Sequence, residues 1–155
     1  MFYDVKHTRF SSLYLYFDDK DHLRAITFSE PKSLIYGKNS ASESLKKQLD
    51  EYFLGKRKSF EVKIIIDNAS SFQKRVWETL LEIPYGDVKT YKWLSKKIDL
   101  NHAYRAVGIA LNMNPIPIII PCHRIIKSDG SIGGYSGGIG MKRFLIELER
   151  TKQKN

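Results

Sequence analysis

The sequence predicts an α+β protein. We expect a small N-terminal α/β domain with a short antiparallel sheet, followed by a mainly helical C-terminal domain. Two observations predict this division: strand-like runs rich in aromatic residues occupy the beginning of the chain, whereas residues 71–113 hold three stretches with the spacing of amphipathic helices. Between them, IDNASS at residues 66–71 has the polar composition of a connection. We therefore expect domains at residues 1–68 and 69–155.

The N-terminal domain begins with two expected strands. RFSSLYLYF at residues 9–17 and HLRAITF at residues 22–28 are separated by the polar turn DDKD. Apolar and aromatic residues crowd both runs, so the pattern does not decide which face of the strands is buried. A further apolar run, VKIII at residues 62–66, predicts another strand.

A helix is expected between these strands, from Ser40 to a stop at Gly55. Leu45, Leu49 and Phe53 share one face of it. Ser40 and Glu43 have the spacing of a capping box at its start.

The C-terminal domain is expected to contain three helices, at residues 71–83, 90–98 and 102–113. Each has an apolar stripe that we expect to face inward. The stripe residues are, in chain order, Phe72, Val76, Leu80 and Ile83; Tyr91, Leu94 and Ile98; and Ala103, Ala106, Val107, Ala110 and Leu111.

The second and third of these helices are joined by a tight turn, which is a helix-turn-helix pattern. The outer face of the third carries Arg105, Gly108 and Asn112. A glycine inside a helix costs roughly 1 kcal/mol relative to alanine, so close approach of another backbone would explain Gly108. The same pattern is also consistent with a plain helical hairpin in a core.

The charge balance is consistent with two kinds of protein surface. Twenty-six Lys and Arg against seventeen Asp and Glu give a net charge of +9 and a pI near 9.6. Such a balance is typical of a nucleic-acid-binding domain, and also of a lysine-rich solvated surface.

Other sequence features exclude several classes. One cysteine excludes an internal disulfide and a cysteine-rich zinc site, and the four histidines share no ligand spacing. We therefore expect no metal. The N-terminus lacks the apolar core of a signal peptide, and no apolar run approaches the ~20 residues of a membrane span. These features predict a cytoplasmic protein without a membrane partner.

The only cysteine, Cys122, lies within IIIPCHRII at residues 118–126. A cysteine attacks as its thiolate, and a neighbouring His or Arg lowers the pKa of the thiol. In a strand, Cys122 and His123 would point to opposite faces, so either the chain turns here or a water joins the two side chains. Pro121 favours the turn. Taken alone, Cys122 is also consistent with a small buried hydrophobic residue.

A glycine-rich segment follows, KSDGSIGGYSGG at residues 127–138. Asp129-Gly130 is a hairpin signal, and further glycines surround Tyr135 and Ser136. Exposed backbone N–H groups beside an aromatic ring suit a flat polar ligand, although a flexible surface loop has the same composition.

Three blocks together resemble a known family: FQKRVWETLLEIPYGDVKTY, RAVGIALNMNPIPIIIPCHR and IPCHRIIKSDGSIGGYSGG. They are similar to the O6-alkylguanine-DNA alkyltransferases over about residues 70–150. The resemblance implies DNA repair by direct reversal. The protein would flip O6-alkylguanine out of duplex DNA and transfer the alkyl group irreversibly to Cys122, in one turnover and without a cofactor, acting as a monomer.

The resemblance also implies roles for individual residues. Cys122 would be the acceptor, His123 the base that acts through a water, Glu149 its orienting carboxylate, and Asn114 the link between the recognition helix and the active-site segment. Tyr91, Tyr135, Ser136 and Pro117 would contact the flipped base or its alkyl group. Arg105 would fill the gap in the base stack, while Ala103, Ala106 and Gly108 would permit a close fit to the minor groove.

Two other classes explain part of the sequence. A helix-turn-helix regulator without alkyl transfer accounts for the charge but not for PCHR and the glycine-rich segment. A cysteine hydrolase accounts for Cys122 and His123, but it needs an oxyanion hole and leaves Arg105 without a role.

Overall fold

A computed structural model describes residues 1–153, in which the chain divides into two compact units. Unit 1 comprises Met1–Asp67, and unit 2 begins at Asn68. The sequence places the boundary one residue later, between residues 68 and 69. The α+β class and the helical character of the C-terminal part are confirmed by the element order.

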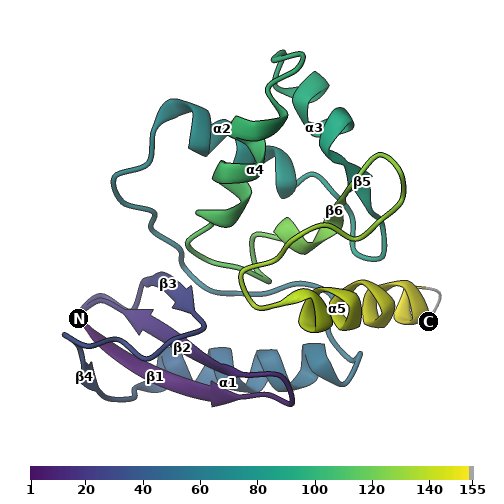
Figure 1. Ribbon diagram of the computed structural model, residues 1–155. Helices are drawn as coiled ribbons and strands as arrows, with labels where there is room; N and C mark the ends of the chain where they lie inside the picture. Colours follow the sequence, from purple (N-terminus) through teal and green to yellow (C-terminus); the bar gives the residue numbers. More distant parts are fainter. Residues whose placement is uncertain (154–155) are drawn as a thin grey trace. The chain divides into compact units, whose positions relative to one another are not determined.

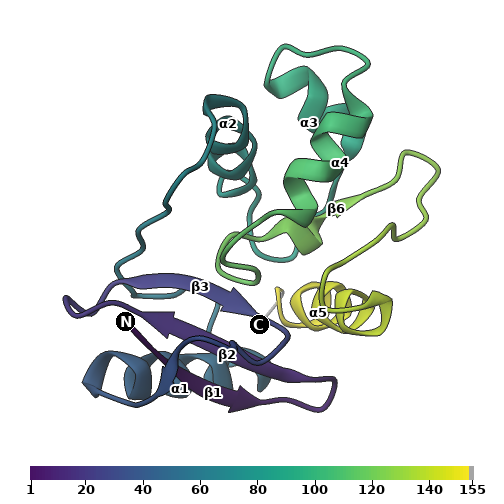
Figure 2. The same ribbon diagram turned by 60° about the vertical axis from the view of Figure 1, so that its left-hand side comes forward.

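Unit 1 is built on a four-stranded sheet with the order β3-β2-β1-β4. Its strands are β1 (Phe2–His7), β2 (Ser12–Phe17), β3 (Leu23–Thr27) and β4 (Ile35–Tyr36). The first three are antiparallel neighbours, whereas the short β4 pairs parallel to β1. Helix α1 (Ser40–Phe53) lies along one face of this sheet (Figure 1; Figure 2).

Strand β2 has the alternation of a half-buried strand, because Leu13, Leu15 and Phe17 are fully buried while their neighbours are not. Strand β1 was not predicted because its pattern is broken by Asp4. This aspartate is fully buried and accepts hydrogen bonds from Ser42 Oγ at 2.8 Å and from Lys46 Nζ at 3.2 Å. From the sequence alone an aspartate is expected to be exposed, because a carboxylate is buried only when it is paired.

Two details of the prediction for unit 1 are wrong. The capping box of α1 joins Asn39 and Ser42, because the Asn39 side chain accepts from the backbone N–H of Ser42. Ser40 is already inside the helix. Residues 62–66 do not form a strand: one bridge pairs Ile64 with Leu23, and the ladder extends no further.

Unit 2 contains the other elements. These are α2 (Ser71–Leu80), β5 (Lys89–Thr90), α3 (Tyr91–Lys97), α4 (Tyr104–Asn112), the 3₁₀ turn η1 (Cys122–Arg124), β6 (Ile125–Ile126) and α5 (Ile139–Lys152). β5 and β6 pair in parallel, so the start of α3 lies beside the segment that leaves η1 (Figure 1).

Helices α2, α3 and α4 pack around a small apolar core (Figure 1). Trp77 of α2 donates its indole N–H to the carbonyl of Ala110 at 2.9 Å, which fixes α2 against α4. The expected inward stripe of α4 is partly wrong: Val107, Ala110 and Leu111 are buried, but Ala106 is exposed and Ala103 is half-buried. Within residues 1–153, no helix has the length and apolar character needed to cross a membrane.

Candidate active site

The turn η1 carries Cys122 at its start. Cys122 is 6% exposed and His123 is fully buried. The single 3₁₀ turn, entered through Pro121, bends the chain, so the two neighbouring side chains are not held on opposite faces of a strand. The sequence left open a sharp turn or a bridging water; the chain does turn here, but His123 Nδ1 has no hydrogen-bond partner in residues 1–153, so the turn does not join the two side chains directly.

Asn114, two residues after the end of α4, holds the segment that leads to Cys122. Its side-chain N–H donates to the carbonyl of Ile120 at 2.8 Å, and its Oδ1 accepts from the backbone N–H of Ile116 at 3.0 Å. Its side chain also lies near enough to Cys122 to lower the pKa of the thiol. The loop it closes contains Ile118 at φ 75°, a conformation that β-branched residues rarely adopt. Asn114 therefore connects the end of α4 to the segment that carries the thiol.

Glu149 of α5 is the centre of a buried ionic cluster. His123 Nε2 lies 2.7 Å from Glu149 Oε2, and Arg124 Nε and Nη2 donate to the same carboxylate at 2.8 and 3.1 Å. Arg124 Nη1 donates to the carbonyl of Ile83 at 2.7 Å. Glu149 is 1% exposed. Three donors on one carboxylate compensate its removal from water.

The cluster determines the protonation states. Burial raises the pKa of Glu149, but hydrogen bonds from His123 and Arg124 outweigh it and hold this pKa at about 2. The ionised carboxylate can only accept, so His123 carries its proton on Nε2. Burial lowers the pKa of His123 despite Glu149, which keeps the ring neutral. Its Nδ1 is then an acceptor, and it is buried with no hydrogen-bond partner in residues 1–153.

The environment of Cys122 favours its protonated thiol form over the thiolate. Burial raises the pKa of Cys122, while the Asn114 side chain and the positive charge of Lys142 oppose that rise without cancelling it. Lys142 is 1% exposed and donates to the carbonyls of Ile125 at 2.6 Å and Gly134 at 3.2 Å. Burial lowers the pKa of Lys142 to about 8. A base is therefore needed to take the thiol proton at neutral pH.

A narrow hollow of about 10 Å³ reaches Cys122, which is room for about one water molecule. Its lining residues are Tyr91, Leu111, Asn112, Cys122, Gly134, Tyr135, Ser136 and Lys142. Gly133 has φ 78°, and a Cβ there would lie 3.3 Å from the hydroxyl of Tyr91. The glycine-rich segment can pass this close to Tyr91 because it has glycine at that point.

The structure thus brings together most of the residues to which the resemblance assigned chemistry. Cys122, Tyr91, Tyr135 and Ser136 line one hollow, and His123 and Glu149 are bonded behind it. Pro117 does not line this hollow; it is buried in the loop closed by Asn114.

The residues assigned to DNA lie on α4 and at its start. Arg105 is exposed and makes no hydrogen bond or ion pair with the described residues. A Cβ added at Gly108 would meet nothing within 4 Å, so no part of the protein itself requires glycine at this position. Gly108 and exposed Ala106 thus form a surface of small residues around Arg105, whose guanidinium group has no partner in the described residues.

The sequence reading missed Arg124 and Lys142. Arg124 could have been found from its position next to His123. Lys142 reads as an ordinary surface lysine, but it shares a helix face with buried Leu145 and with Glu149, at i, i+3 and i+7. Within the part of the chain that the structure describes, no group of three or more His, Cys, Asp or Glu side chains could hold a metal ion.

Comparison with known proteins identifies the family. Residues 71–151 match the family described as 6-O-methylguanine DNA methyltransferase, DNA binding domain. The chain belongs to this family. The match covers more than half of the chain and includes η1, α3, α4 and most of α5, and it confirms the resemblance seen in the sequence.

Individual relatives of the methyltransferase family extend the match. A methylated-DNA–protein-cysteine methyltransferase of Methanosarcina barkeri is 51% identical over 105 residues, which are 68% of this chain and 66% of that protein. Its counterpart in Methanosarcina acetivorans is 42% identical over 84% of this chain and 87% of its own length. The first alignment thus spans just under two thirds of the relative.

Solved structures of the family agree with the fold of both units. The crystal structure of Mycobacterium tuberculosis OGT in complex with DNA is 35% identical, with a TM-score of 0.89, and the match covers 98% of this chain and 94% of that one. A structure of O6-methylguanine methyltransferase from the same organism matches with a TM-score of 0.87. The fold therefore agrees beyond the 81 residues of the family match.

Proposed function

We propose that this protein repairs duplex DNA by transferring the alkyl group of O6-alkylguanine to Cys122. The observation that carries the proposal is the buried thiol beside a neutral histidine whose Nε2–H is bonded to an ionised glutamate. This arrangement supplies an acceptor, a base and an orienting group.

The transfer balances without a cofactor. A water between Cys122 and His123 passes the thiol proton to the free Nδ1 of His123, and Glu149 stabilises the imidazolium that results. The sulfur attacks the alkyl carbon in line with the C–O6 bond. A C–S bond forms, the C–O bond breaks, and guanine leaves as its anion. The hydroxyl of Tyr91 donates a hydrogen bond that stabilises this anion, and the proton taken up by His123 passes back through water to neutralise it. The thioether is stable, so each molecule reacts once.

The burial of the thiol supports base flipping. Cys122 is reached through a hollow the size of about one water molecule, so neither a stacked guanine nor a flipped one fits as the hollow stands. The lesion must leave the duplex, and Tyr135 and Ser136 of the glycine-rich segment must move to admit it. Pro117 would then border the alkyl group from the buried loop beside Asn114.

The surface of α4 supports the DNA contact. Arg105 is exposed and unpaired among the described residues, which leaves it available to fill the space of the departed nucleotide. Ala103, Ala106 and Gly108 leave the helix narrow enough for the minor groove. The M. tuberculosis relative was solved in complex with DNA, which supports DNA as the partner here. A cytoplasmic location, a monomeric state and domains at residues 1–68 and 69–155 stay predictions.

The experiment is the intact mass of the protein after incubation with duplex DNA containing O6-methylguanine, followed by peptide mapping. We expect one methyl group on the peptide containing Cys122 and none in a Cys122→Ala variant. Binding of this DNA with no change in mass would contradict the proposal and favour a helix-turn-helix protein that recognises the lesion without repairing it.

A further inference from the structure

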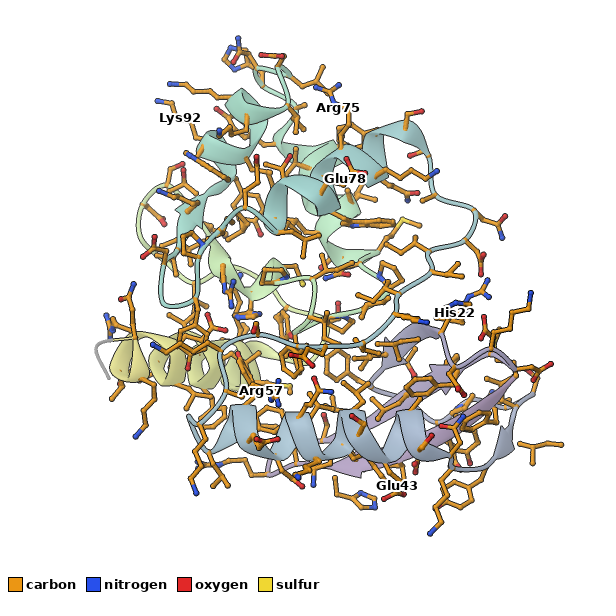
Figure 3. The ribbon with its side chains drawn as sticks, turned by 180° about the vertical axis from the view of Figure 1, so that it is seen from behind. His22, Glu43, Arg57, Arg75, Glu78 and Lys92 are labelled. Carbon is orange, nitrogen blue, oxygen red and sulfur yellow. The ribbon has the colours of Figure 1, made fainter. Side chains whose placement is uncertain are left out.

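Helix α3 carries several positive charges that have no role in the proposed chemistry at Cys122 or in the proposed DNA contact of α4. Lys92, Lys96 and Lys97 are exposed on this helix, and Lys89 is half-buried just before it. Figure 3 shows Lys92 pointing away from the ribbon. None of these four ammonium groups forms an ion pair with an acidic residue in residues 1–153.

The lysines are grouped around Trp93. Lys89 Nζ lies 5.6 Å from the centroid of the Trp93 ring, and Lys97 Nζ lies 5.8 Å from it. Such contacts place a cation over an aromatic face but leave its charge uncompensated. Two ammonium groups of like charge therefore lie near one half-buried aromatic ring.

Nearby acidic groups form no ion pair with these lysines in residues 1–153. Glu78 and Glu82 of α2 line a shallow hollow with Lys97, yet neither lies within 4.0 Å of its ammonium group. Lys92 and Lys96 are four residues apart on the helix, a spacing at which like charges destabilise it. A chain that keeps this arrangement gains from an anion supplied by a partner.

We propose that Lys92, Lys96 and Lys97, with Lys89 over Trp93, form a phosphate-binding face for the backbone of duplex DNA outside the lesion. This rests on the proposed function. In helix-turn-helix proteins that enter the major groove, the first helix crosses the DNA backbone. Helix α3 is the corresponding first helix here and packs against α4, so when α4 enters the minor groove the α3 face is close to the phosphates that border it. Lysine binds phosphate as a point charge and reads no sequence. The face therefore gives lesion-independent, salt-dependent binding.

The test is the affinity for undamaged duplex DNA over a series of salt concentrations. The variant is Lys92→Gln, Lys96→Gln and Lys97→Gln together. Its matched control removes the same charge from exposed lysines of unit 1 that make no ion pair within residues 1–153: Lys32→Gln, Lys47→Gln and Lys56→Gln. Because each phosphate contact contributes about 0.9 to the slope of log K against log salt, we expect the α3 variant to lose two to three units of slope and about 10-fold in affinity at low salt.

Three outcomes would overturn the proposal: a wild-type slope in the α3 variant, an equal loss in the control, or no recovery when the three lysines are replaced by arginine. The rate of reaction with free O6-alkylguanine base should be unchanged in all variants, which shows that the site is folded. A wild-type protein that binds DNA with the expected slope but transfers no methyl group would contradict the proposed function alone.

Discussion

The two units of the chain use their charges differently. Residues 1–67 contain twelve basic and ten acidic residues, and several pair within the unit, as Lys46 does with Asp4 and Arg24 with Asp18. From residue 68 onward there are fourteen basic and only seven acidic residues. One of those seven, Glu149, is fully engaged by His123 and Arg124.

This difference separates charges that support the fold from charges that support chemistry. The pairs of unit 1 compensate one another, and we expect the loss of one partner to affect stability alone. In unit 2 the buried charges fix the protonation of His123 and bias that of Cys122, whereas we propose that the exposed ones on α3 and α4 contact DNA. Each of the following variants tests that contrast.

The largest effect is expected at the buried carboxylate. Glu149→Gln keeps the shape of the side chain but removes the charge that holds His123 in its reactive tautomer. We expect the single-turnover rate of methyl transfer to fall by about 100- to 1000-fold. The matched control is Glu147→Gln, an exposed residue of the same helix that pairs with Arg150 at the surface. A Glu149→Gln rate within a few-fold of the control would remove the relay from the mechanism.

Asp4→Ala should lower stability and leave the transfer rate unchanged, which is the opposite of the result expected for Glu149→Gln. It removes the buried acceptor that Ser42 and Lys46 share and leaves them only the Asn39 carbonyl and Glu43, respectively. We expect a loss of about 2–3 kcal/mol in the free energy of unfolding. The transfer rate per folded molecule should not change. Denaturant titration measures the free energy of unfolding. The control is Asp50→Ala, which removes the exposed partner of half-buried Lys6 and is expected to lose less than about 1 kcal/mol. Slower transfer by folded Asp4→Ala would show that unit 1 contributes to the chemistry.

Arg105→Ala should slow repair of O6-methylguanine in duplex DNA by about 10-fold, because one charged contact with DNA is worth roughly 1–3 kcal/mol. Reaction with the free base needs no base flipping and should keep its rate. Arg143→Ala removes an exposed arginine from α5 and serves as the control. Equal losses on duplex and free base would contradict the assignment of Arg105 to DNA.

The pH profile gives the smallest effect. Because burial raises the pKa of Cys122, the transfer rate should increase with pH through the neutral range. Lys142 favours the thiolate while it is charged, so the increase should slow above its pKa of about 8. Lys142→Met removes this charge, raises the pKa of Cys122 further, and should lower the rate a few-fold at pH 7. At high pH the rate should recover, whereas a merely structural defect would persist at every pH.

Much of unit 2 could be predicted from the sequence because its signals are local. The helices at residues 71–83, 90–98 and 102–113 have apolar residues at helical spacing, and the structure places α2, α3 and α4 inside those ranges. Strand β1 could not be predicted, since Asp4 interrupts its pattern and is satisfied by Ser42 and Lys46 from a helix distant in sequence. Ala106 was predicted to face inward from the helical spacing of apolar residues alone. That spacing cannot distinguish a residue of the core from a small apolar residue on an exposed surface.

The site was predictable in its sequence-adjacent part only. Cys122 and His123 are consecutive, so their partnership is visible in one motif. Glu149 came from the family resemblance, because nothing in MKRFLIELER distinguishes one glutamate from another. Lys142 was missed, as its burial depends on carbonyl groups of Ile125 and Gly134 that only the folded loop supplies.

The chain contains a single thiol, and that thiol is 6% exposed. A neutral thiol-labelling reagent has no other sulfhydryl of this chain to modify. If Cys122 is the alkyl acceptor, as proposed, each label added reports one molecule that has not yet reacted, and labelling counts the remaining active sites. Because the hollow above Cys122 holds about one water molecule, we expect labelling without DNA to be slow, and its rate would measure how often the thiol becomes accessible.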